Sequence, residues 1–298
     1  MTVVCPSSKL NDAVHVVVRE ESLRSLKHDM PTRFIGVDLG GGKGKKTALA
    51  ILERSSDGVS VTVLRPRSGE APLYDKALVD VIRSHAEGAV LCVDAPLTLP
   101  PCIRCQVPVC PGQQACQDRE VAIMRRLFDA PAIEPSRDFR RGKPGITPYT
   151  QRATDIYLLR RREILARETL GQGMGPLTAR AAHLTRTVAD LFTLNQDLIE
   201  VYPRATLELL GFRAPYRKRV DQRIDILAGL RDLSFAPGIW REECRQSDHA
   251  FDAVVCAYTG YLRSRDGWVP LPELSDARSG WIWVPPEVAE KQTEAAAE

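Results

Sequence analysis

Three short apolar runs, separated only by tight turns, constrain the fold of this chain more than any other feature. They cover residues 33–39, 47–53 and 59–64, and glycine-rich or Asp-Gly turns join them. A segment with helical spacing of apolar residues follows at 74–85, and a fourth apolar run occupies 90–93. The expected order is strand, strand, strand, helix, strand, which predicts an α/β protein.

That order is typical of the opening of an RNase H-like domain and differs from a Rossmann domain, where strands and helices alternate from the start. A fifth strand is expected at 197–202 and a short terminal strand at 280–285. Helices are expected at about 118–128, 150–170, 179–192, 204–210, 218–231 and 248–263. We therefore predict an α/β RNase H-like domain over residues 33–284, with a mixed five-stranded sheet flanked by helices.

The rest of the chain is expected to be accessory to this domain. A cysteine- and proline-rich insertion covers 99–148, and residues 285–298 form an expected disordered tail. Residues 1–32 form an extension that we expect to be poorly ordered, and one hypothesis takes Met30 as the true start. The N-terminus lacks a signal-peptide pattern and no run approaches the roughly 18 apolar residues of a membrane span. We therefore expect a cytoplasmic protein with reduced cysteines and no membrane partner.

Two of the expected strands end in a carboxylate. Asp38 closes the run of Phe34, Ile35 and Val37, and Asp94 closes the fourth run. A carboxylate at the end of a buried strand is costly unless it is hydrogen-bonded or binds a cation. Each aspartate alone could simply cap its turn. Because the first and fourth strands are neighbours in the predicted topology, both carboxylates can face one site.

Three further acids are candidates for the same site. Glu200 lies within the expected fifth strand, and Asp248 and Asp252 share one face of the last helix. Asp248 could instead cap that helix, and the adjacent His249 is interpreted as incidental. Clustered carboxylates of this kind hold two Mg²⁺ or Mn²⁺ ions, which activate water and stabilise a leaving phosphodiester oxygen. The expected metal ligands are Asp38, Asp94 and Asp252.

A cluster of four cysteines is the second chemical signal. Cys102, Cys105, Cys110 and Cys116 lie within fifteen residues of one another. In a cytoplasmic chain this spacing favours a metal site over core packing. Zn²⁺ in a tetrahedral site of four sulfurs is the first interpretation, and an iron–sulfur cluster is the alternative.

Local basic clusters suggest contact with phosphates, although the net charge is only +3. Arg140, Arg141 and Lys143 form one stretch, and Lys218 lies in another between Arg217 and Arg219. These residues are candidates for binding nucleic acid, DNA or RNA. The alternative for each is solvated charge on an exposed surface.

Four motifs in order resemble domain-of-unknown-function family 429, which is regarded as a family of predicted nucleases with an RNase H fold. They are Gly36 to Gly41, Val93 to Pro100, Glu200 to Ala205 and Asp248 to Ala253, and the closing Gly280 to Pro285 also fits. The last two also resemble RuvC-type resolvases. The resemblance implies that Asp38, Asp94 and Asp248 or Asp252 bind the catalytic metals, with Glu200 a weaker candidate. The cysteine insertion departs from the pattern.

Three functions are compatible with these residues. The first is a metal-dependent nuclease that hydrolyses DNA or RNA by a two-metal-ion mechanism. The second is a non-catalytic nucleic-acid-binding or regulatory module that uses the cysteine site and the arginine clusters. The third is an actin-like phosphotransferase, which is disfavoured because a second Asp-Gly strand motif is not found in the C-terminal half.

Overall fold

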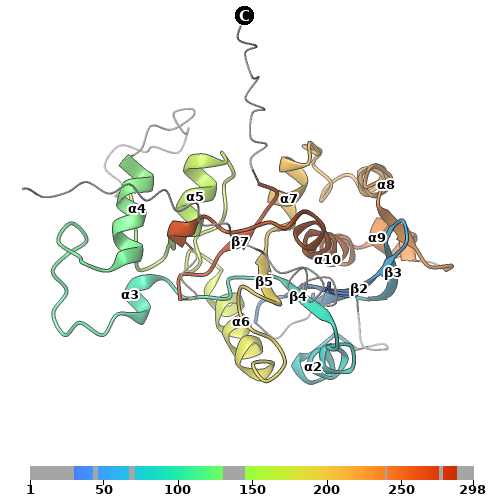
Figure 1. The fold of residues 1–298 in the computed structure, drawn as a ribbon, viewed down its shortest axis with the longest axis horizontal. Helices are drawn as coiled ribbons and strands as arrows, with labels where there is room; N and C mark the ends of the chain where they lie inside the picture. Colours follow the sequence, from blue (N-terminus) through green and yellow to red (C-terminus); the bar gives the residue numbers. More distant parts are fainter. Residues whose placement is uncertain are drawn as a thin grey trace, which may run out of the picture. The chain divides into compact units, whose positions relative to one another are not determined.

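A seven-stranded mixed sheet forms the centre of the structure (Figure 1). The computed structural model describes residues 30–42, 46–66, 71–129, 145–238, 240–274 and 278–286 of the 298-residue chain. The strands are β1 (Arg33–Asp38), β2 (Ala48–Ser55), β3 (Gly58–Arg65), β4 (Ala89–Asp94), β5 (Leu198–Val201), β6 (Leu233–Phe235) and β7 (Ile282–Trp283). They are arranged in the order β6-β3-β2-β1-β4-β5-β7. Strands β1, β2 and β3 pair antiparallel, whereas β1, β4, β5 and β7 run parallel.

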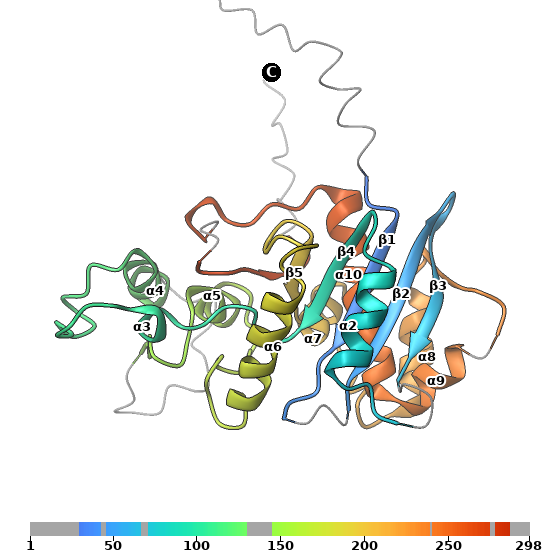
Figure 2. The ribbon, with the colours of Figure 1, turned by 90° about the horizontal axis from the view of Figure 1, so that it is seen from below.

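The helices cover both faces of this sheet. They are α2 (Asp75–Ser84), α3 (Pro101–Arg104), α4 (Arg119–Asp129), α5 (Ala153–Arg161), α6 (Gly175–Thr187), α7 (Pro203–Leu209), α8 (Val220–Gly229), α9 (Trp240–Gln246) and α10 (Asp248–Asp266), with a short 3₁₀ turn at Pro272–Leu274. Helices α2 and α6 lie on one face, and α10 lies on the other (Figure 2). None of the described helices combines the length and the apolar character needed to span a lipid bilayer.

The strand pattern of the sequence explains both layers of core. Alternate residues of β1 face opposite sides, so that Phe34 packs under α10 and Ile35 packs under α2 and α6. Gly36 lies on the α10 side, where an added Cβ would stand 2.0 Å from the backbone oxygen of Ala253. This glycine therefore lets α10 approach β1 closely. The close approach determines which residues of α10 reach the end of β1.

The α/β class and the first four strands are confirmed, and the five-stranded sheet is wrong. The sheet gains β6, which pairs with β3, and the short terminal strand expected at 280–285 joins it as β7, which pairs with β5. The long helix expected at 150–170 is also wrong, because α5 ends at Arg161 and Glu163 takes a left-handed backbone conformation with φ 55°. The amide of Ile164 then donates to the carbonyl of Leu158, which returns the buried Ile164 to the core. Most of the N-terminal extension and of the tail lies outside the described residues.

Candidate active site

The carboxyl ends of β1 and β4 bring Asp38 and Asp94 side by side. The two strands are parallel, and Asp38 is the register partner of Asp94. Because partners in register point to the same face, both side chains lie on the face covered by α10. Each closes a strand whose preceding residues are almost all buried. Neighbouring carboxylates at the carboxyl edge of parallel strands are thus confirmed as a geometric feature of the fold.

Helix α10 adds Asp252 to this pair. Asp252 is 2% exposed, and its carboxylate accepts hydrogen bonds from the Tyr216 hydroxyl at 2.8 Å and from Nη2 of Arg217 at 3.0 Å. The Asp248 side chain, at the start of α10, is more exposed. It is not the helix cap, because the hydroxyl of Ser247 accepts the capping bond from the amide of Ala250.

His249 belongs to the site and is not incidental. Its Nδ1 lies 2.5 Å from Oδ2 of Asp38, and its Nε2 lies 3.8 Å from Oδ1 of Asp248. The hydrogen bond to Asp38 raises the pKa of His249, so that the imidazole carries a proton more readily than a free histidine. The sequence held a signal for this residue, because His249 precedes Asp252 by three positions and shares its helix face.

Asp94 has fewer hydrogen-bond partners in the described part of the chain than Asp38 or Asp252. Among the described residues, no group donates a hydrogen bond to its carboxylate, although Asp38 and Asp252 both have partners. Burial, followed by the charges of Asp38 and Asp252, raises the pKa of Asp94 well above its ordinary value. Burial and then Asp38 raise the pKa of Asp252 to about 7. The site is therefore short of positive charge near Asp94.

The side chain of Glu200 lies on the other face of the sheet from Asp38 and Asp94, and its hydrogen-bond partners differ from theirs. The buried guanidinium of Arg152 donates to both of its carboxylate oxygens at 2.7 Å, and the amide of Leu97 donates at 2.9 Å. The same guanidinium donates to Asp155 at 3.0 Å. The carboxylate of Glu200 is thus already neutralised by protein groups. Its catalytic role stays a prediction, and nothing in its contacts favours it.

The aspartates near α10 and the acids bound by Arg152 line one cavity of about 230 Å³. Its wall carries six carboxyl groups, three arginines and a histidine: Asp38, Asp94, Asp155, Glu200, Asp248, Asp252, Arg152, Arg167, Arg217 and His249. Arg152, Arg217 and His249 are each paired with one or more of these acids. Carboxylates therefore exceed cations around the cavity, which lies where parallel α/β sheets commonly bind ligands, outside the carboxyl ends of the strands.

The acids match a divalent cation in the chemistry of their oxygens and in their unmet charge, but not in the present arrangement of their side chains. Hard cations such as Mg²⁺ take carboxylate oxygens and water, and Asp94 presents a carboxylate without a donor among the described residues. As the described side chains stand, no three of the His, Cys, Asp and Glu residues form a group that could hold a metal ion. The expected Mg²⁺ or Mn²⁺ site stays a prediction.

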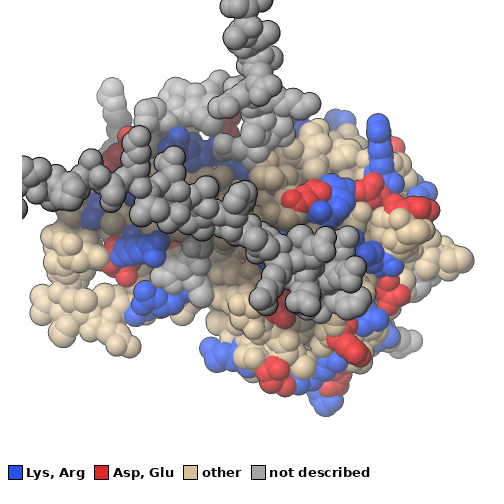
Figure 3. Space-filling view, in the orientation of Figure 1, with Lys and Arg blue, Asp and Glu red and all other residues tan. Residues whose placement is uncertain are grey.

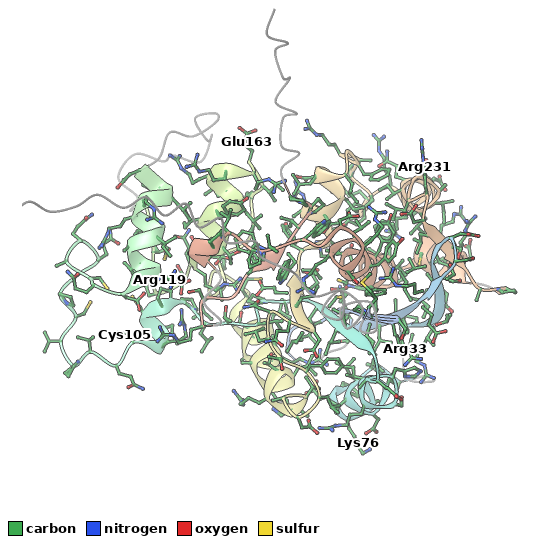
Figure 4. All side chains as sticks on the ribbon, in the orientation of Figure 1. Arg33, Lys76, Cys105, Arg119, Glu163 and Arg231 are labelled. Atoms are coloured by element: carbon green, nitrogen blue, oxygen red, sulfur yellow. The ribbon has the colours of Figure 1, made fainter. Side chains whose placement is uncertain are left out.

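The four clustered cysteines lie away from this cavity. They follow the start of α3 in the chain. The loop that contains the labelled Cys105 lies beyond the end of the sheet that is farther from β3 (Figure 4; the same loop is seen in Figure 2). Cys102, Cys105 and Cys110 are exposed, and Cys116 is half-buried. Burial, followed by the charges of Cys110, Cys116 and Cys105, raises the pKa of Cys102. The amide of Val107 donates to Sγ of Cys105 at 3.4 Å. Metal binding by this loop also stays a prediction.

The predicted nucleic-acid contacts are only partly described. Arg140, Arg141 and Lys143 lie outside the described residues. Lys218 is exposed and lines a second hollow close to the acidic cavity. Lys and Arg are interspersed with Asp and Glu over the visible face formed by α8 and α9 (Figure 3). Arg217 was predicted only as a member of a basic cluster, and its ion pair with Asp252 was not predicted. Arg152 and Tyr216 were not predicted as site residues, because contacts between distant segments leave no local pattern.

The fold and this cavity define a mixed α/β protein with a carboxylate-rich cavity at the carboxyl edge of its parallel strands. The chain belongs to the family described as "Protein of unknown function (DUF429)", which matches residues 36–276. No curated protein matches the chain, and no solved structure does so either.

Proposed function

We propose that this protein is a metal-dependent nuclease of the RNase H-like kind, which hydrolyses phosphodiester bonds of DNA or RNA in the acidic cavity. The observation that carries the proposal is the register pairing of Asp38 with Asp94, with Asp252 against them and no hydrogen-bond donor to Asp94 among the described residues. The strand order β3-β2-β1-β4-β5 within the sheet supports the RNase H-like assignment.

The protein groups have distinct tasks in this proposal. Asp38, Asp94 and Asp252 would hold Mg²⁺ or Mn²⁺, which supplies an activated water and stabilises the leaving oxygen. His249 and Arg217 orient Asp38 and Asp252 through their hydrogen bonds. Arg167 is exposed and lines the same cavity, where its guanidinium can contact a phosphate oxygen.

Substitution of the two paired aspartates tests the proposal. Asp38→Asn and Asp94→Asn should each reduce Mg²⁺- or Mn²⁺-dependent cleavage of labelled DNA and RNA by at least about 100-fold, the scale on which loss of one charge-stabilising group acts. Asp80→Asn is the matched control, because Asp80 is an exposed residue of α2 that pairs only with Lys76 among the described residues. Parent-like cleavage by both site variants would reject the assigned site.

A second candidate is a nucleic-acid-binding or regulatory module whose cysteine loop binds Zn²⁺. Two observations favour it: Asp38 and Asp252 already have protein partners, and a backbone amide points at Cys105 Sγ, as it would toward a thiolate. Metal analysis and a visible spectrum of the purified protein separate the possibilities. About one zinc per chain without colour fits the zinc loop. A brown protein indicates an iron–sulfur cluster. Bound metal without cleavage of any substrate favours the module.

A further inference from the structure

A second hollow lies next to the acidic cavity and has the opposite charge. We call it the basic groove, and its volume is about 290 Å³. Its charged lining consists of Arg204 and Glu208 from α7 and Arg213, Arg217 and Lys218 from the segment between α7 and α8. Four cations thus face a single carboxylate.

The cations of the groove are only partly neutralised. Arg204 donates to Glu208 at 2.6 Å, which uses the one acid of the lining. Arg213 and Lys218 are exposed and have no hydrogen-bond or ion-pair partner among the described residues. A comparable hollow beside α9 differs, because there Arg245 pairs with both Asp221 and Glu242. Unmatched positive charge therefore distinguishes the basic groove from an ordinary solvated surface.

Arg217 connects the basic groove with the acidic cavity. Its side chain lines both, and its Nη2 lies 3.0 Å from Oδ2 of Asp252. The side chain is still 53% exposed, so part of the guanidinium faces solvent. A ligand that reaches the acids can therefore continue past Arg217 into the groove.

The backbone at Arg217 is held by hydrogen bonds from a buried side chain. The buried guanidinium of Arg223 donates to the carbonyl oxygens of Tyr216 and Arg217, at 3.0 Å and 3.2 Å. The ring of Tyr216 packs on Phe251 with ring centres 4.9 Å apart, and its hydroxyl binds Asp252. The groove is therefore held in place by the same helix that supplies the acid, which is a preorganised arrangement.

We infer that the basic groove binds the phosphate of a phosphodiester chain that neighbours the phosphate at the acidic cavity. The inference rests on the proposed function and deepens it, because it makes the ligand a strand with at least two phosphates. Arg213 and Lys218 supply the free charges, and Arg217 bridges the two sites. Guanidinium and ammonium groups are the usual partners of phosphate oxygens in sequence-independent binding. DNA and RNA share this chemistry, and the experiment tells them apart.

The test measures binding separately from cleavage. Fluorescence anisotropy of labelled short single-stranded DNA and RNA is followed in Mg²⁺ with Asp94→Asn as the background, so that the strand is not cut. Adding Arg213→Gln and Lys218→Gln together should weaken binding about tenfold and reduce the slope of log K against log salt by about 1.4, or about 0.7 for each lost contact. The matched control adds Lys76→Gln and Arg231→Gln, two exposed cations on α2 and beyond the end of α8 (labelled in Figure 4).

Each outcome decides one of the two proposals. Unchanged binding in the groove variant, an equal loss in the control, or no binding of either strand overturns the groove, even if the parent protein cleaves. Groove-dependent binding without cleavage by the parent protein supports the groove and rejects the catalytic proposal. A melting temperature of both triple variants equal to that of Asp94→Asn shows that the loss does not come from unfolding.

Discussion

The carboxylates on the two sides of the acidic cavity differ in their hydrogen-bond partners. On the α5 side, Glu200 and Asp155 share the buried guanidinium of Arg152, and the amide of Leu97 adds a further bond. On the α10 side, Asp94 receives no hydrogen bond from the described residues, and its neighbours Asp38 and Asp252 repel it. The acids on both sides lie at or near the carboxyl edge of the sheet.

This difference separates structural from functional acids. A buried carboxylate with a complete set of donors is stable as it stands and needs nothing further. A carboxylate held among like charges without a donor is costly, and a bound cation removes that cost. We therefore assign ligand binding to the α10 side and fold stabilisation to the α5 side. Three substitutions test the assignment.

The largest effect is expected from Arg152→Met. It leaves Glu200 and Asp155 buried without their cation, and breaking a buried ion pair from one side costs about 3–5 kcal/mol. Chemical denaturation should show this loss in the free energy of unfolding. Arg161→Met, an exposed change at the other end of α5, is the control and should stay within about 0.5 kcal/mol of the parent. A loss below about 1 kcal/mol for Arg152→Met would contradict the structural role of this side.

A smaller effect is expected from Gly36→Ala, which acts on the α10 side through packing. The new Cβ would stand 2.0 Å from Ala253 O and 2.5 Å from Ala257 N, so helix α10 must move away from β1. Overpacking of this kind costs about 1–3 kcal/mol. The movement also separates Asp252 from Asp38, so cleavage should fall together with stability.

Gly175→Ala is the control for that change. Gly175 begins α6 and has open space around its Cβ position, so the variant should be neutral or slightly stabilising. Thermal unfolding and a cleavage assay on both variants complete the comparison. Equal stability of the two glycine variants would show that α10 does not depend on the close approach.

The smallest effect, and one of opposite sign, is expected from Asp94→Asn in EDTA. The pKa of Asp94 is raised in the folded state by burial and by Asp38, Asp252 and Glu200, against the opposing charge of Arg217. The folded protein then holds this proton to higher pH than the unfolded chain does, so stability falls as the pH rises from about 4 through the raised pKa. The variant cannot ionise at this position and escapes that loss.

Asp94→Asn should therefore match the parent near pH 4 and exceed it above pH 7, by about 1 kcal/mol, the size of a typical single substitution. Denaturant titration at the two pH values measures the difference. Adding Mn²⁺ above pH 7 should raise the melting temperature of the parent and leave the variant unchanged, because a cation replaces the missing donor only where the carboxylate is present. A variant less stable than the parent at both pH values would contradict the repulsion.

The first four strands and the short terminal strand at 280–285 were predictable from the sequence, whereas β6 and the end of α5 were not. Strands β1, β2 and β4 carry continuous apolar runs, β3 alternates, and Asp38 and Asp94 stand at the ends of β1 and β4. Strand β6 has only three residues, held by pairing with β3, which leaves too little pattern to detect. The helix expected at 150–170 ends early because Ile164 returns to the core, a choice that depends on tertiary packing.

Local sequence was enough to predict the order of most elements and the acids at their ends, because turn residues and periodicity act over a few residues. Tertiary structure alone decided which acids are neutralised. Arg152 reaches Glu200 across 48 positions, and His249 reaches Asp38 across 211. The strength of an ion pair depends on distance and burial in space, and neither is encoded in local spacing. For the same reason, local spacing could not predict that the acidic cavity and the basic groove share the side chain of Arg217.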